Sequence, residues 1–164
     1  MTENVEKGFF IELLEIIKLA TIFAIRKMSF QSVLFFMAFL ALGLGDGVTS
    51  AYMMEKLGAN AEINPIMRLI FLEHGIGGMV MAKIWLTLML LFAVYVVQLK
   101  SNGRAFWTVN GFLIALTAGG ILAMNANLSA INGLVPASPG EIIVIYMALV
   151  LSLTEAGSYI DNHL

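Results

Sequence analysis

Four long apolar stretches alternate with short polar connections along this chain. They cover residues 29–52, 75–99, 104–128 and 139–159. Each is long enough for a helix that crosses the hydrocarbon core of a bilayer, which takes about 20 mostly apolar residues. The pattern predicts an all-α polytopic integral membrane protein with four transmembrane helices, folded as a single membrane domain over residues 1–164.

The segment before the first span, residues 3–27, has a different pattern. Glu12, Glu15 and Lys18 recur every third residue among apolar neighbours, which keeps the charges roughly on one helical face. This predicts an amphipathic helix that lies in the membrane interface. A tilted additional span is the alternative, although two carboxylates in mid-segment would be costly inside a bilayer.

Capping signals mark where helices begin and end. In the predicted outer loop, residues 53–74, Asn64-Pro65 predicts the start of a short helix and His74-Gly75 predicts its end. Before the last span, Ser138 stands three residues ahead of Glu141, which is the spacing of a capping box. These connections are therefore expected to be ordered.

Composition agrees with a membrane location. Hydrophobic residues make up 60% of the chain and charged residues 12%, with a mean hydropathy of +0.91. Soluble domains carry about 25% charged residues. The net charge of −2, without a basic stripe, argues against a nucleic-acid partner, and the absence of cysteine excludes disulfides and thiolate metal sites. No cofactor is predicted.

Basic residues predict the orientation. Arg26 and Lys27 precede the first span, and Lys100 and Arg104 lie between the second and third, whereas the other two loops hold fewer basic residues. Loops rich in Lys and Arg stay on the cytoplasmic side. We expect a multi-pass protein of the cytoplasmic membrane, or of a single cell membrane, with both termini in the cytoplasm.

Two spans contain a charge where apolar residues are expected, Asp46 and Lys83. An ionisable residue inside a span is costly unless it is paired or hydrated, so it is a functional-site hypothesis by default. At the helical rise, Asp46 lies about 25 Å beyond the cytoplasmic start of its span, and Lys83 about 12 Å below the outer start of the next. Their depths nearly coincide, which predicts a structural ion pair.

Further polar residues are expected near this pair. Thr49 and Ser50 share a helical face with Asp46, and asparagines come near the outer end of the third span. The predicted outward-facing cluster adds Thr49, Ser50, Asn64, Asn125 and Asn127 to the pair, beneath Glu55, Glu62 and His74 of the outer loop.

Three interpretations of the cluster remain open: packing or assembly, a binding or transport site, and catalysis. A buried ion pair can fix the register of two helices, and the small-xxx-small pair Gly43 and Gly47 favours close packing. The candidates for acid–base catalysis are Asp46, Glu62 and Lys83. Weak candidates for binding a divalent metal are Asp46, Glu62 and His74. We favour packing.

The sequence Gly43-Leu44-Gly45-Asp46 resembles the GxGD signature of intramembrane aspartyl proteases. Those enzymes use two aspartates that share a proton. The other aspartate here, Asp161, follows the motif and is expected at the opposite, cytoplasmic end. We interpret the likeness as coincidental.

A longer pattern runs over residues 40–90: Asp46-x-x-Thr49, then Glu62-x-Asn64-Pro65, then Lys83 in the following span. It is similar to an uncharacterised family of small, largely archaeal, four-span prokaryotic membrane proteins. The resemblance implies that these six residues belong to one constellation. It implies no activity.

From these features we expect a structural or accessory subunit of a larger membrane complex, of the respiratory or monooxygenase type; archaeal ammonia monooxygenase is one assembly to test. The expected partners are the lipid bilayer and other integral membrane subunits, and a homo-oligomer remains open. The alternative is a small membrane enzyme that acts on a lipid-linked or phosphate-bearing substrate at the acidic and lysine site in the outer leaflet.

Overall fold

The computed structural model describes residues 29–163, together with Glu15 and Lys18. Contacts divide the chain into two units, residues 1–33 and 34–164, and packing is described below for the second unit. The predicted amphipathic helix, residues 3–27, lies outside the described residues except for Glu15 and Lys18, which are both exposed.

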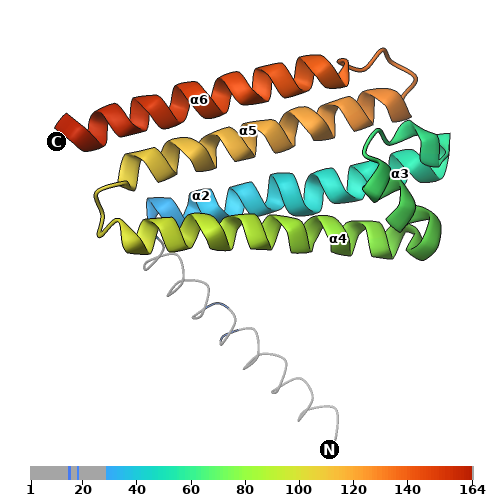
Figure 1. Cartoon of the computed structure of the whole chain (residues 1–164). Helices are drawn as coiled ribbons and strands as arrows, with labels where there is room; N and C mark the ends of the chain where they lie inside the picture. The colour runs from blue at the N-terminus through green and yellow to red at the C-terminus, as the bar shows by residue number, and fades with distance from the viewer. Residues whose placement is uncertain (1–14, 16–17, 19–28, 164) are drawn as a thin grey trace, which may run out of the picture. The chain divides into compact units, whose positions relative to one another are not determined.

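Helices joined by short connections make up residues 30–163 (Figure 1). In chain order these are α2 (Phe30–Ala38), the π-helical segment η1 (Phe39–Gly45), α3 (Asp46–Leu57), the 3-10 turn η2 (Ala59–Ala61), α4 (Pro65–Lys100), α5 (Phe106–Ile131) and α6 (Pro139–His163). Within the described part of the chain, four helical stretches are long and apolar enough to cross a membrane: Phe30–Leu57, Pro65–Lys100, Phe106–Ile131 and Pro139–His163. This all-helical architecture agrees with the prediction from the sequence.

The connection between the first two long helices is shorter than the predicted loop, residues 53–74. Helix α3 continues to Leu57 because no helix-breaking residue precedes Gly58, whose φ of 91° ends it. Helix α4 then begins at Pro65, where the Asn64 side chain accepts hydrogen bonds from the Ile66 and Met67 amides at 3.0 and 3.4 Å. Most of the predicted loop is therefore helical.

Two local signals in the sequence are confirmed. Gly75, with a φ of 64° and a ψ of −159°, breaks α4 into a short first part and a long second part. At the start of α6 the Ser138 amide donates to the Glu141 carboxylate at 2.7 Å, and the Glu141 amide donates to the Ser138 hydroxyl at 3.2 Å. This is the reciprocal capping box.

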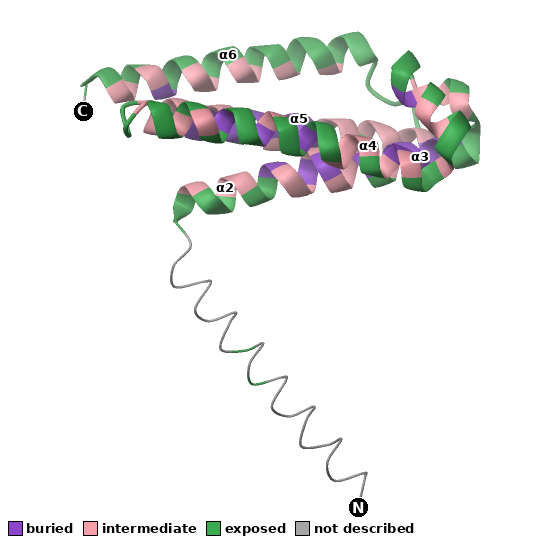
Figure 2. Ribbon diagram, turned by 60° about the horizontal axis from the view of Figure 1, so that its bottom comes forward, coloured by how far each residue is buried: buried purple, intermediate pink, exposed green. Residues whose placement is uncertain are grey.

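Helix α5 occupies the centre of the second unit. It packs against α6 on one side and against η1 and α3 on another, while α4 packs against η1 and α3 (Figure 1). The buried residues gather on the facing sides of these helices, as Figure 2 shows for α3 and α5. One buried cluster consists of Ala38, Leu91, Val94, Val109, Leu113 and Leu116, and a second of Ala51, Met54, Met67 and Met79.

Glycines bring α5 and α6 into direct backbone contact. A Cβ atom added to Gly111 would overlap the Leu153 carbonyl, and one added to Gly157 would overlap the Trp107 carbonyl. Small residues at such positions are typical of helices that pack closely in membranes.

The Asp161 side chain joins the end of α6 to the beginning of α5. Its carboxylate accepts hydrogen bonds from the Trp107 and Thr108 amides at 2.9 and 2.8 Å and from the Thr108 hydroxyl at 2.7 Å. It thus satisfies the amides that the first turn of α5 leaves without helical partners. Helix α5 has no capping side chain of its own, because Ala105 occupies the capping position.

Candidate functional site

Asp46 is the first residue of α3 and follows directly on the π-helical segment η1. Its amide donates to the carbonyl of Ala41, five residues earlier. A π-turn inserts one residue into a helix, which rotates the following residues by roughly 100° about the helix axis. Segments of this kind are frequent at functional sites, and this one sets the face that Asp46 presents.

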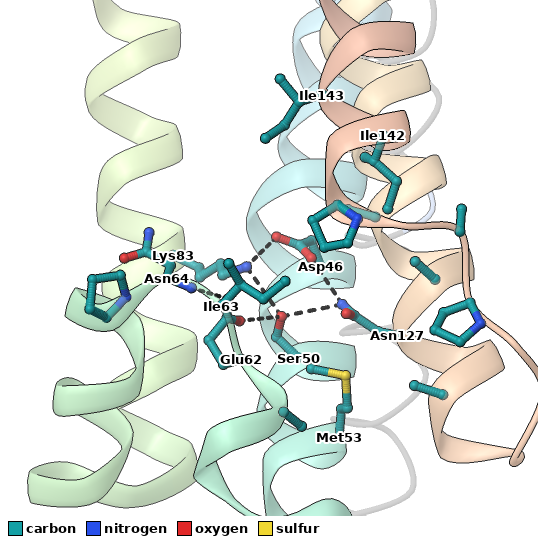
Figure 3. Close-up of a pocket in the computed structure, with 18 residues that line it drawn as sticks. Asp46, Ser50, Met53, Glu62, Ile63, Asn64, Lys83, Asn127, Ile142 and Ile143 are labelled. Carbon is teal, nitrogen blue, oxygen red and sulfur yellow. Dashed lines mark hydrogen bonds and ion pairs between the residues drawn. The ribbon is translucent and has the colours of Figure 1, made fainter.

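The Asp46 carboxylate pairs with the Lys83 ammonium of α4 (Figure 3). The Asp46 side chain is 14% exposed and the Lys83 side chain 18% exposed. Gly47 permits the approach of the two helices, because a Cβ atom there would lie 3.3 Å from the Lys83 Cβ. The two misplaced charges of the sequence therefore meet.

Helix α5 contributes Asn127 to the same point. The Asn127 Nδ2 lies 3.0 Å from the Asp46 Oδ1, 3.1 Å from the Thr49 hydroxyl and 3.2 Å from the Ser50 hydroxyl. Thr49 in turn donates to the Gly45 carbonyl at 2.8 Å. Side chains of α3, α4 and α5 thus converge on one carboxylate.

Ser50 links this group to the loop before α4. Its side chain is almost fully buried, at 2% exposure, and its hydroxyl lies 3.2 Å from the Lys83 ammonium. The same hydroxyl donates to the Glu62 carboxylate at 3.3 Å (Figure 3). Glu62 also accepts from the Asn64 amide at 3.0 Å, while the Arg68 guanidinium donates to the Glu62 main-chain carbonyl at 2.6 and 3.1 Å. We call Asp46, Thr49, Ser50, Glu62, Lys83 and Asn127 the polar network.

A cavity of about 570 Å³ lies beside the polar network. Its volume falls within the range of about 300 to 1,000 Å³ that is usual for small-molecule sites. Polar residues line one part, and the remaining wall is apolar (Figure 3). The lining consists of Asp46, Ser50, Met53, Ala61, Glu62, Ile63, Asn64, Pro65, Lys83, Ala123, Ala126, Asn127, Ala130, Pro136, Ala137, Pro139, Ile142 and Ile143.

Three residues predicted in the cluster or its roof lie elsewhere: Asn125, His74 and Glu55. Asn125 is exposed, because two residues along a helix correspond to about 200° of rotation and Asn127 occupies the inner face. His74 is also exposed, and its ring lies 3.9 Å from the Glu73 carboxylate. Glu55, predicted in the roof of the cluster, is exposed on α3 and does not line the cavity.

The predicted metal ligands are not gathered. Asp46 and Glu62 are joined through Ser50, whereas His74 stands at the end of the first part of α4 and does not line the cavity. Among residues 29–163, no three His, Asp or Glu side chains come close enough to hold a metal ion. What the geometry assembles is an ion pair with hydrogen-bonding neighbours.

Some residues of the cavity wall and of the helix caps could not be predicted from the sequence. The α6 residues Ile142 and Ile143 form part of the cavity wall, and apolar residues in an apolar span carry no distinguishing signal. Lys56 donates to the Ile131 carbonyl at 2.9 Å and thereby caps the C-terminus of α5. A basic residue near a helix end is common, so its partner was not evident.

The sequence that forms this site matches a known protein family. A family model described as a domain of unknown function, DUF5658, matches residues 37–133. The match includes every residue of the polar network and ends before α6. Neither the curated proteins nor the solved structures include a match to the chain. On the strength of the match to most of its length, the chain belongs to the uncharacterised DUF5658 family.

Proposed function

We propose that the chain is a structural or accessory subunit of a larger membrane complex, and that α6 contacts its neighbour there. The observation that carries this proposal is the position of Glu155. Leu153 and Gly157 face α5, and Glu155 lies midway between them in sequence. It is therefore about 200° around the helix from each. Its side chain is exposed.

The carboxylate of Glu155 has no hydrogen bond or ion pair within residues 29–163. Helix α6 ends at His163, so Glu155 lies about 12 Å inside that end by the helical rise. A charged side chain at the centre of a span costs about 3 kcal/mol on insertion scales. A basic or amide side chain from a second transmembrane helix would reduce this cost.

The residues around Glu155 are compatible with such a neighbour. Ala148 and Ser152 are exposed on the same side of α6, four residues apart. The Ser152 hydroxyl bonds back to the Ala148 carbonyl at 2.6 Å, so it does not project as a free donor. This small-xxx-small spacing allows another helix to approach closely. We infer a partner helix that carries Lys, Arg, Asn or Gln at the depth of Glu155.

The class of complex to test first is the respiratory or monooxygenase type. The described residues are almost entirely in long apolar helices with short connections. Such a chain offers little surface outside a bilayer, so its contacts would be made within the membrane. Glu155 belongs to α6, outside the matched family region, so the partner is expected to be particular to chains that carry an α6 of this kind.

The test is purification of the intact chain from its native membranes in a mild detergent, with quantitative mass spectrometry of co-purifying subunits. We expect defined membrane proteins in a fixed ratio. The Glu155→Leu variant should no longer co-purify with these subunits. Glu55→Gln, at an exposed carboxylate of α3, should still co-purify with them in the same ratio. A wild-type chain that purifies alone and stays folded would contradict the proposal.

The cavity favours a second candidate, a small membrane enzyme that acts on a lipid-linked or phosphate-bearing substrate. Asp46, Glu62 and Lys83 all line the cavity, where they could take part in proton transfer. Replacing Glu62 by Gln would then remove turnover and leave co-purification with partners intact. Loss of the partners in Glu155→Leu with full turnover would separate the two functions.

A further inference from the structure

We propose that the cavity beside the polar network binds an amphiphile with a protonated amine head and an apolar chain. The head would lie at Glu62, and the chain would lie along α5 and the start of α6. This inference is independent of the proposed partner of α6. It opposes the phosphate-bearing substrate of the second candidate function, because both ligands would occupy the same cavity.

The charges of the lining favour a cationic head. The lining contains two carboxylates, Asp46 and Glu62, and one ammonium, Lys83. Asp46 is already paired with Lys83, which leaves the charge of Glu62 without a cationic partner in the lining. Arg68 lies outside the lining and donates to the Glu62 main-chain carbonyl and not to its carboxylate. A partly buried charge is stabilised by an opposite charge.

The hydrogen-bonding capacity of the site also favours a cationic head group. Lys83 has three N–H donors. Two of them are directed at Asp46 and Ser50. Among residues 29–163, the Glu62 carboxylate accepts from neutral donors only, the Ser50 hydroxyl and the Asn64 amide. A carboxylate has about four acceptor positions, so capacity remains for a donating ligand. A protonated amine supplies such donors, whereas a phosphate head would place its charge against Glu62.

The opposite wall has room for an apolar chain. Ala123, Ala126 and Ala130 recur at helical spacing on one face of α5, where small side chains leave space. Ile142 and Ile143 cover this space from α6. The cavity is thus polar at Glu62 and apolar along α5, the two ends that an amphiphile requires.

The test uses the full-length protein in a neutral maltoside detergent and measures ligand binding by isothermal titration calorimetry. Dodecylamine should bind in a saturable manner with one site per chain. Dodecyl phosphate, with the same chain and the opposite charge, should bind at least about tenfold more weakly, because a charge-assisted hydrogen bond is lost and a repulsion is gained. Propylamine should not bind, because the apolar wall would stay unfilled.

Variants separate binding in the cavity from partition into the detergent. Glu62→Gln should weaken dodecylamine binding by about tenfold, whereas Glu55→Gln, at an exposed carboxylate outside the cavity, should leave it unchanged. Ala126→Leu fills the apolar wall without altering the polar network and should also abolish binding. It keeps the test valid where Glu62→Gln fails to fold.

Three results would overturn the proposal. Equal or tighter binding of dodecyl phosphate would show that Lys83 selects an anionic head instead. Equal binding of dodecylamine to the wild type and to Ala126→Leu would show that the amine only enters the detergent. Binding of propylamine with the same affinity as dodecylamine would exclude an amphiphile and assign the site to small free amines.

Discussion

Asn127 of α5 donates a hydrogen bond of 3.0 Å to Asp46 of α3, although 81 residues separate the two in sequence. The other carboxylate oxygen of Asp46 accepts from Lys83 of α4. One aspartate therefore connects three of the long helices. Asp46 therefore has a structural role in holding the helices together. It can take part in chemistry in the cavity only while its contacts with Asn127 and Lys83 are kept.

The ion pair can be measured by a double-mutant cycle. Asp46→Asn leaves the Lys83 ammonium without its partner, and Lys83→Met leaves the carboxylate without its own. Because both side chains are mostly buried, each single change is expected to cost about 2 kcal/mol or more of unfolding free energy. The double variant should be more stable than the sum of the singles predicts, by about 1 kcal/mol or more. Unfolding in mixed micelles provides the measurement, and strictly additive losses would argue against a pair.

The close contact between the π-helical segment η1 and α5 predicts that Gly120 cannot be enlarged without a loss of stability. A Cβ atom at Gly120 would lie 2.7 Å from the Ala41 carbonyl carbon and 2.8 Å from the Leu42 amide nitrogen, both backbone atoms. Gly120→Ala should therefore destabilise the protein by about 1 to 3 kcal/mol. Gly77→Ala is the matched control, since a Cβ there meets nothing within 4 Å. That control should be neutral or stabilising by up to about 1 kcal/mol. The comparison is made by thermal unfolding; equal effects of the two changes would contradict the close approach.

The cap that α6 provides to α5 makes a third prediction. Asp161→Ala removes the acceptor of the Trp107 and Thr108 amides. Loss of a capping side chain costs about 1 to 2 kcal/mol. Asn162→Ala, at the next and exposed residue, should cost less than half as much. Amide hydrogen exchange would locate the effect, with faster exchange confined to the first turn of α5 in Asp161→Ala. Faster exchange throughout α5 would instead indicate a general loosening of the α5–α6 contact.

Near-neighbour signals in the sequence predicted much of the fold. Asn64 and Pro65 start α4, Gly75 breaks it, and the Ser138–Glu141 box starts α6, because each depends on residues within one helical turn. Counting helical rise also predicted that Asp46 and Lys83 lie at nearly the same depth, because depth depends only on position along a span. The ion pair expected from this match of depths is present.

Helix rotation could not be obtained in the same way. The π-helical segment η1 rotates α3 about its axis, and no pattern in the sequence predicted this segment. The choice between Asn125 and Asn127 depends on which face of α5 turns inward, and that face is set by packing with η1 and α6. The apolar wall of the cavity comes from helices that are distant in sequence, so the cavity was not predicted.

The rotation of α5 can be tested with the two asparagines themselves. Asn127→Ala removes the amide that donates to Asp46, which leaves a mostly buried carboxylate oxygen without that donor. The expected cost is about 1 to 3 kcal/mol of unfolding free energy. Asn125→Ala, two residues away on the exposed face, should change the unfolding free energy by less than about 0.5 kcal/mol. Chemical unfolding in micelles would compare them. A larger loss in Asn125→Ala would mean that α5 is rotated from the orientation described, and the cavity wall formed by Ala123, Ala126 and Ala130 would then face elsewhere.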